Sequence, residues 1–207
     1  MGRYIVAITG ASGAVYGRRL TEVLADQGHF LYLLITDPAK QVIAAELGWD
    51  LSANEADQQA ALAAYLGPER AKHITYLDYH DLTAAVASGS VKTEGMVVAP
   101  CSMATVAGIA HGMARNLVER AADVMLKEKR PLVLVPRETP LNQVHLQNLL
   151  SLAQMGVTIL PAMPAFYHHP QEIAGLVDFV VGRVMEQLGL THRLYQAWGG
   201  PSPPEVQ

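Results

Sequence analysis

Short apolar runs rich in β-branched residues recur along the chain, separated by segments with helical spacing. Five runs predict strands buried on both faces of a sheet, at residues 4–9, 30–35, 96–99, 132–135 and 157–160. Apolar positions at three- and four-residue intervals predict helices over residues 16–26, 117–127, 141–155 and 171–188. Strands that alternate with helices pair in parallel through right-handed crossovers. The pattern therefore predicts an α/β fold, a three-layer Rossmann-like sandwich with a mainly parallel, doubly wound sheet.

The region between the second and third of these runs is less regular. An alanine-rich helix is expected over residues 54–66, and residues 74–77 are the candidate for a sixth strand. Gly and Pro residues stand at predicted strand ends rather than in one block, so residues 1–198 are expected to form a single domain. Residues 199–207 (GGPSPPEVQ) suit neither helix nor strand and are expected to form a tail.

Composition narrows the class of protein. The chain has 207 residues, 50% hydrophobic and 16% charged, so it can bury a sizeable core without disulfides or structural metal. Its formal net charge of -4 disfavours nucleic-acid binding. Residues 95–114 carry no charged side chain, but Pro100, Ser102 and His111 interrupt them, so no membrane span is expected. The single cysteine, Cys101, cannot form an internal disulfide, which favours a cytoplasmic location.

Small residues follow the first predicted strand, at positions 10–17 (GASGAVYG). In a doubly wound sheet, ligands bind beyond the carboxyl ends of the strands. Small side chains let a ligand approach the backbone, and the free N–H groups of the next helix attract an anion, which outlines a phosphate or flavin cradle. The dinucleotide pattern G-x-G-x-x-G is not met, because Ser12 and Val15 replace its second and third glycines. The alternative is a tight turn in which Ser12 caps the helix.

Three further strand ends carry polar groups. Asp37 suits either a ribose contact or the start of a helix. Residues 100–105 (PCSMAT) form a polar helix start that suits a phosphate or an aromatic ring edge, and Cys101 is either a nucleophile or a small buried side chain. Arg137 suits a phosphate and Glu138 suits proton transfer, with a plain ion pair that caps the next helix as the alternative.

Two other groups of polar residues favour simpler roles. Residues 115–130 carry many charges at i, i+4 spacing, and most of these side chains are expected to face solvent. The adjacent His168 and His169 diverge from each other, and no carboxylate is spaced to help them. No metal site is therefore expected.

Motifs spread over nearly the whole chain resemble the UbiX-type flavin prenyltransferases. They stand at residues 9–14 (TGASGA), 87–90 (ASGS), 100–102 (PCS), 119–123 (ERAAD), 126–128 (LKE), 130–140 (RPLVLVPRETP) and 164–168 (PAFYH). The resemblance implies that reduced FMN is the prenyl acceptor and dimethylallyl phosphate the donor. It also implies a homo-oligomer, commonly a dodecamer, and a UbiD-type decarboxylase that receives the product.

The resemblance implies roles for particular residues. FMN would contact Gly10, Ala11, Ser12, Thr36, Ser102, Met103, Ala104, Thr105 and Arg137. Dimethylallyl phosphate would be held by Ser90, Lys127, Arg137, Glu138, Tyr167 and Arg183. Ser12, Glu46, Lys127 and Glu138 would be catalytic.

The implied reaction agrees with the chemistry of these side chains. In such enzymes the prenyl group alkylates N5 of reduced FMN, and a second bond to C6 closes a ring. A cationic ring of Lys127, Arg137 and Arg183 would stabilise the departing phosphate without a metal. Glu138 would exchange a proton with the phosphate, and Trp198 would cover the allyl cation through a cation–π contact.

Three other functions are weighed against this one. An FMN-dependent cysteine decarboxylase would show a Pro-Ala-Ser-Ala-Asn-Thr-like motif where this chain has Pro-Cys-Ser-Met-Ala-Thr at residues 100–105. A non-enzymatic flavin carrier would lack the phosphate-binding set that is complete here. A dinucleotide dehydrogenase is disfavoured by the absence of the second and third glycines.

Overall fold

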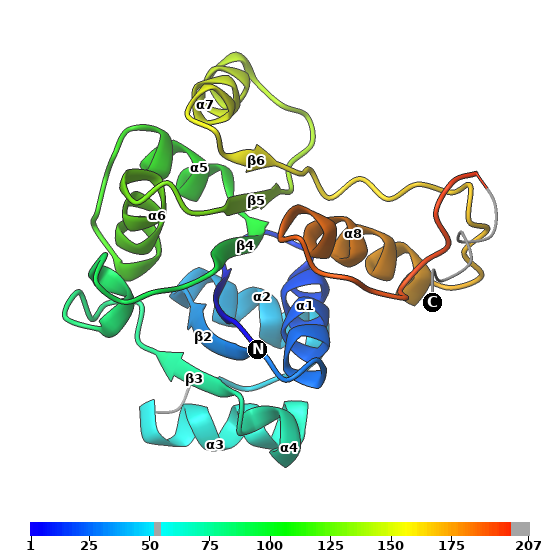
Figure 1. Ribbon diagram of the computed structural model, residues 1–207, viewed down its shortest axis with the longest axis horizontal. Helices are drawn as coiled ribbons and strands as arrows, with labels where there is room; N and C mark the ends of the chain where they lie inside the picture. Colours follow the sequence, from blue (N-terminus) through cyan, green and yellow to red (C-terminus); the bar gives the residue numbers. More distant parts are fainter. Residues whose placement is uncertain (52–54, 200–207) are drawn as a thin grey trace, which may run out of the picture.

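The computed structural model, which describes residues 1–51 and 55–199, contains a six-stranded parallel sheet with helices on both faces (Figure 1). The strands are β1 (Arg3–Ile8), β2 (Phe30–Ile35), β3 (Ile74–Leu77), β4 (Gly95–Cys101), β5 (Leu132–Pro136) and β6 (Thr158–Ile159). Their order, β3-β2-β1-β4-β5-β6, is doubly wound, because the chain runs outward from β1 to β3 and then returns to place β4 beside β1. The expected fold class is confirmed, and residues 74–77 are the sixth strand.

The predicted helices are all present; the helix predicted over residues 117–127 has the same ends in the structure, and most of the others have shifted ends. The helices are α1 (Ala14–Asp26), α2 (Asp37–Leu47), α3 (Glu55–Leu66), α4 (Pro68–Ala71), α5 (Met103–Ala110), α6 (Leu117–Lys127), α7 (Gln143–Gln154) and α8 (Ile173–Gln187), with a 3-10 turn, η1 (Ala85–Ala87). α7 begins later than predicted because Asn142 is its N-cap and accepts the amide of His145 at 2.9 Å. Residue 54 of the expected alanine-rich helix lies outside the described residues.

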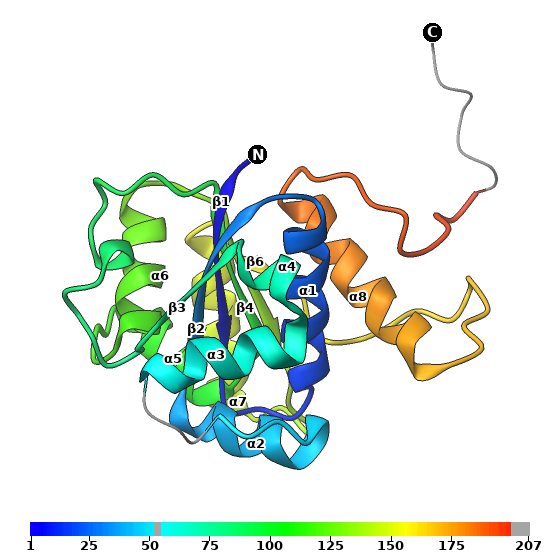
Figure 2. The ribbon, with the colours of Figure 1, turned by 90° about the horizontal axis from the view of Figure 1, so that it is seen from below.

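The two faces of the sheet bury separate cores. Along β1, Val6 and Ile8 point into a core shared with α1 and α8, whereas Ile5 and Ala7 point into a core shared with α5, α6 and α7. This is the two-residue alternation of a strand that is covered on both faces. Figure 2 shows α1 and α8 on one side of the strands and α5 and α6 on the other.

Glu119 is an exception to the expectation that most charged side chains of residues 115–130 face solvent. The side chain of Glu119 is only 2% exposed and accepts three hydrogen bonds from Arg115, two from the guanidinium and one from the backbone amide. Gly108 of α5 makes room for it, since a Cβ there would lie 2.3 Å from the Glu119 carboxylate. Burial of an ion requires such paired, hydrogen-bonded partners. Glu119 therefore joins α6 to α5 rather than facing solvent.

Two further expectations concern the absence of a membrane span and the presence of a C-terminal tail. Within the described residues, no helix is both long enough and apolar enough to cross a bilayer. Of the expected tail, residues 200–207 lie outside the described residues.

Candidate functional site

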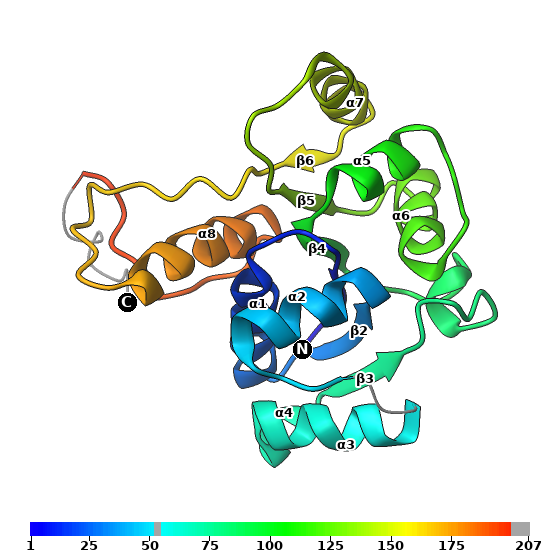
Figure 3. The same cartoon turned by 180° about the vertical axis from the view of Figure 1, so that it is seen from behind.

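The carboxyl ends of β1 and β4 meet at the switch point of the sheet, and Figure 3 looks onto this edge with α2 in front. Thr9 joins the two strand ends and is only 1% exposed. Its hydroxyl donates to the Pro100 carbonyl at 2.9 Å and accepts from the Ser102 amide at 2.8 Å. Open doubly wound sheets bind ligands in the crevice at such a point. Thr9 had no role in the sequence prediction, because only the fold brings residues 9 and 100 together.

Two glycines shape the turn between β1 and α1. A Cβ on Gly10 would lie 2.5 Å from Cβ of Pro38, so only glycine lets the turn pass the start of α2. Gly13 is the N-cap of α1 with a φ of 104°, in the left-handed region that favours glycine, and it makes no side-chain cap. The alternative in which Ser12 caps α1 is therefore wrong.

A carboxylate from another helix caps α1 instead. Glu46 of α2 accepts from the Gly13 amide at 2.9 and 3.1 Å and from the Ala14 amide at 2.9 Å. The Ser12 side chain also lies close to this carboxylate. These N–H groups were expected to bind a ligand anion, and that expectation is corrected: they hold the protein's own carboxylate. The arrangement brings the predicted catalytic residues Ser12 and Glu46 together.

The surroundings of Glu46 keep it ionised at neutral pH. Burial acts to raise the pKa of its carboxyl group, but the Ser12 hydroxyl, the Gly13 and Ala14 amides and the Arg137 charge together hold that pKa below its usual range. A carboxylate that is hydrogen-bonded in its charged form has a lowered pKa. Glu46 is therefore a charged hydrogen-bond acceptor at neutral pH.

Replacing Glu46 with Gln is expected to destabilise the protein by about 1 kcal/mol at pH 7, the usual effect of losing a helix cap. A lowered carboxyl pKa stabilises the fold above the unfolded pKa, and this stabilisation is lost as the pH falls through the folded pKa. Urea unfolding should therefore show wild type and Glu46→Gln converging below about pH 4. Glu69→Gln, which removes an exposed carboxylate from α4, is the control and should leave stability unchanged. A difference in stability between wild type and Glu46→Gln that is as large below about pH 4 as at pH 7 would contradict the capping role.

Arg137 and Glu138 follow β5 and face the same turn. Nε of Arg137 donates to the Ser12 carbonyl at 3.1 Å, and Glu138 accepts the Thr139 amide at 2.9 Å. The alternative of an Arg137–Glu138 pair that caps the next helix is wrong, because Asn142 caps α7. Arg137 thus closes the crevice from the side of β5.

The other predicted FMN residues lie at two helix starts. The Thr36 hydroxyl, on a residue that is 8% exposed, accepts the Ala39 amide at 3.3 Å and caps α2. Ser102 caps α5 by accepting the Thr105 amide at 3.3 Å, and the two hydroxyls lie 3.0 Å apart. The first turn of α5 also contains Met103, which is buried, and Ala104, which is exposed. The structure thus gathers an edge group: Gly10, Ala11, Ser12, Thr36, Glu46, Ser102, Met103, Ala104, Thr105, Arg137 and Glu138.

Lys127 and Ser90 form a second group, the α6 group, near the end of α6. Lys127 pairs with Glu128, and a Cβ on Gly89 would lie 2.8 Å from the Lys127 ammonium nitrogen, so the loop that carries Ser90 packs directly on these side chains. Arg130 holds the same loop by donating to two of its carbonyls at 2.7 Å each. The sequence prediction placed Arg130 in a motif but not these contacts, because the bonds join residues about 40 positions apart.

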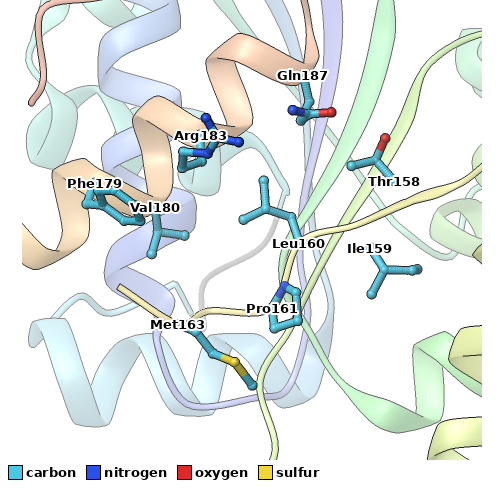
Figure 4. Close-up of a pocket in the computed structure, with 9 residues that line it drawn as sticks. All are labelled: Thr158, Ile159, Leu160, Pro161, Met163, Phe179, Val180, Arg183 and Gln187. Atoms are coloured by element: carbon cyan, nitrogen blue, oxygen red, sulfur yellow. The ribbon is translucent and has the colours of Figure 1, made fainter. Parts of the chain in front are cut away.

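Tyr167 and Arg183 form a third group, the α8 group. Arg183 lines a cavity of about 340 Å³ between α8 and β6, together with Phe179 (Figure 4). Tyr167 contacts Phe179 and Trp198 edge-on, with ring centroids 5.8 and 5.2 Å apart. Trp198 is 80% exposed, so it is available to a ligand or to a second chain.

Within one chain, the edge group lies at the carboxyl ends of the strands and the α6 group at their amino ends. Ser12 stands beyond the carboxyl end of β1, in the turn that leads into α1. Lys127 ends α6, shortly before β5 begins at Leu132, and so stands at the amino ends of the strands. A strand of five residues spans about 16 Å. One chain therefore does not bring Ser12 and Lys127 into a single site.

Other candidates are accounted for by packing. Cys101 is fully buried, and burial raises the pKa of its thiol far above its usual range, which fits the small buried side chain rather than a nucleophile. Asp37 bonds Tyr79, His80 and Lys40 at 3.0 to 3.1 Å. The described residues hold no cluster of three or more His, Cys, Asp or Glu side chains suited to a metal ion.

Comparison with known proteins identifies the family of this chain. The family model "Flavoprotein" matches residues 2–185. Flavin prenyltransferase UbiX of Halalkalibacterium halodurans is 49% identical over 198 residues, covering 96% of this chain and 94% of the relative. The chain belongs to the UbiX flavin prenyltransferase family. The resemblance found in the sequence is thereby confirmed.

Solved structures of the UbiX family share the fold. A dodecameric FMN-dependent UbiX-like decarboxylase from Escherichia coli O157:H7 matches with a TM-score of 0.83 and 41% identity, over 96% of this chain and all of that one. AnUbiX (PadA1), in complex with FMN and dimethylallyl pyrophosphate, matches with a TM-score of 0.83 and 36% identity, over 97% and 99%. Both structural matches cover nearly the whole of this chain.

Proposed function

We propose that this protein is a flavin prenyltransferase that joins the dimethylallyl group of dimethylallyl phosphate to N5 and C6 of reduced FMN. The observation that carries the proposal is the edge group, which lies at the switch point of the sheet in a chain of the UbiX family. Flavin mononucleotide is the class of ligand for which this crevice is suited, because it has a phosphate and a flat ring.

The residues of the edge group fit FMN. Exposed Gly10 and Ala104 leave space for a ring, and the first N–H groups of α5 can receive a phosphate beside Ser102 and Thr105. Because Glu46 occupies the N–H groups of α1, the start of α5 is the site that we assign to the phosphate. Bound here in reduced form, FMN would supply two nucleophilic atoms.

The chain's own side chains would promote departure of the phosphate. Lys127, Arg183 and Arg137 supply positive charge, and Ser90 and Tyr167 supply hydroxyl groups. Preorganised cations stabilise charge that develops on a leaving group. Glu138 would exchange a proton with the phosphate, and the Ser12–Glu46 pair would receive a proton from the acceptor.

A homo-oligomer, which we propose to be a dodecamer, would complete the site. The edge, α6 and α8 groups are separate in one chain, so a neighbouring copy must supply Lys127 to the crevice that holds Ser12. α7 supports assembly, because Val144, Leu146 and Leu150 are 53 to 59% exposed on it. Apolar side chains gathered on a surface mark protein contacts. We further propose that residues 1–198 act as one domain in the cytoplasm and that a UbiD-type decarboxylase receives the product.

Anaerobic incubation with reduced FMN and dimethylallyl phosphate tests the proposed function. Mass analysis of the extracted flavin should show the gain of one C5H8 unit, and a parallel incubation with the pyrophosphate compares the two donors. Flavin that binds and stays unmodified with both donors would refute the proposal. Release of carbon dioxide from a cysteine-terminated peptide would then indicate a cysteine decarboxylase, and its absence a flavin carrier.

A further inference from the structure

The segment after α8 folds back onto this helix, and one carboxylate bonds two of its side chains. Glu186, in the last turn of α8, accepts the Tyr195 hydroxyl at 2.5 Å and lies 3.1 Å from Nε2 of His192. Its second oxygen pairs with the Arg183 guanidinium. Glu186 therefore connects the returning segment, residues 190–198, to Arg183.

The helix surface is shaped to receive this segment. A Cβ on Gly182 would lie 2.6 Å from the Tyr195 ring and 2.7 Å from the His192 ring, so both rings lie directly on the glycine. Tyr195 also packs on Phe179, with ring centroids 4.8 Å apart. Phe179 in turn contacts Tyr167. The returning segment thus completes an aromatic layer behind Tyr167.

The negative charge of Glu186 is paired with the positive charge of Arg183. Burial acts to raise the pKa of Glu186, but Tyr195, His192 and Arg183 outweigh it and keep the pKa lowered. Burial, followed by the bond to Glu186, raises the pKa of Tyr195 to about 12. At neutral pH the cluster is therefore an ionised carboxylate that holds a neutral phenol and a guanidinium.

We propose that Glu186 is a positioning residue for the prenyl donor. It orients Arg183 toward the phosphate and anchors residues 190–198, which keep Tyr167 and Trp198 in place beside the dimethylallyl group. This inference rests on the proposed function, because Arg183 and Tyr167 are the donor-binding residues in that proposal. Glu186 itself acts only through these neighbours.

Glu186→Gln tests the proposal, because it keeps the size of the side chain and removes the charge that holds Arg183. We expect KM for dimethylallyl phosphate to rise about tenfold, the loss of one oriented charge-assisted contact, with kcat and FMN affinity within about twofold of wild type. Trypsin should also cleave after Arg193 several times faster, because the segment detaches. Tyr195→Phe, which keeps the ring on Phe179, should show a smaller change in the same direction, and it serves if Glu186→Gln fails to fold.

Glu172→Gln is the matched control. It removes a carboxylate from the N-cap of the same helix, where the side chain makes no capping bond, and should leave both KM and cleavage unchanged. An unchanged KM, or unchanged cleavage after Arg193, in the Glu186→Gln and Tyr195→Phe variants would overturn the positioning role. A wild-type protein without prenyl transfer would instead refute the proposed function, while the cleavage rates would still report on the anchor.

Discussion

Two inactive variants, Ser12→Ala and Lys127→Met, are expected to restore activity when they assemble into one oligomer. Each alone should lower prenyl transfer by about a hundredfold or more, because one removes a proton relay and the other a charge that stabilises the leaving phosphate. The reason for restoration is geometric. Ser12 lies at the carboxyl ends of the strands and Lys127 at their amino ends, so in the proposed mechanism a complete site takes them from different copies.

The size of the expected recovery follows from random assembly. In an equal mixture, a site receives an intact Ser12 from half of the copies and an intact Lys127 from half of the copies. About a quarter of the sites are then complete, and the mixture should show about a quarter of wild-type activity. Co-expression with two different tags, followed by sequential purification, isolates the mixed oligomers for the prenyl-transfer assay.

A second pair of variants is the control for this experiment. Ser12 and Glu46 lie close together within one chain, so mixed oligomers of Ser12→Ala and Glu46→Gln contain no site with both residues intact. This mixture should be no more active in prenyl transfer than either variant alone. Equal recovery by both mixtures, or no recovery by the Ser12→Ala and Lys127→Met mixture, would show that the site is not shared between copies.

The strands could be predicted from the sequence because parallel strands buried on both faces are short and continuously apolar. The end of β4 could not, since the prediction stopped at Ala99, before a proline that usually ends a strand. In the structure β4 continues through Cys101, where it pairs with Pro136 after an irregularity in the register. Thr9 and Arg137 bond the Pro100 and Cys101 carbonyls there, and these are contacts that only the assembled sheet provides.

Residue types predicted the chemistry of the site. Contacts between residues far apart in the sequence were not predicted. Small residues at positions 10–17 indicated a turn between the first strand and the next helix, and the structure contains that turn. Nothing in their spacing shows that Glu46, 33 positions away, occupies the N–H groups of α1. Glu119 was misjudged for the same reason: its i, i+4 partner Arg115 suggested a solvated pair, but the glycine that makes room for its burial is on another helix.

Gly17→Ala is expected to destabilise the protein by about 2 kcal/mol, although alanine is the better helix former by about 1 kcal/mol. Gly17 lies in the first turns of α1, where the helix crosses the sheet. A Cβ there would lie 2.3 Å from the Ala99 carbonyl oxygen and 2.7 Å from the Ile8 side chain. A backbone oxygen in a central strand cannot move aside, so α1 must shift away from the sheet.

This shift would also open the crevice, because the turn that carries Ser12 leads directly into α1 and Ala99 precedes the Pro100 carbonyl bonded by Thr9. Urea unfolding at a fixed protein concentration measures the stability, and FMN affinity measures the crevice. Gly175→Ala is the matched control on α8, where the nearest atom to a new Cβ is 3.1 Å away on the Pro170 ring and the gain in helix propensity offsets the contact. If Gly17→Ala matched this control in both measurements, the close approach of α1 to β4 would not be what holds the site in shape.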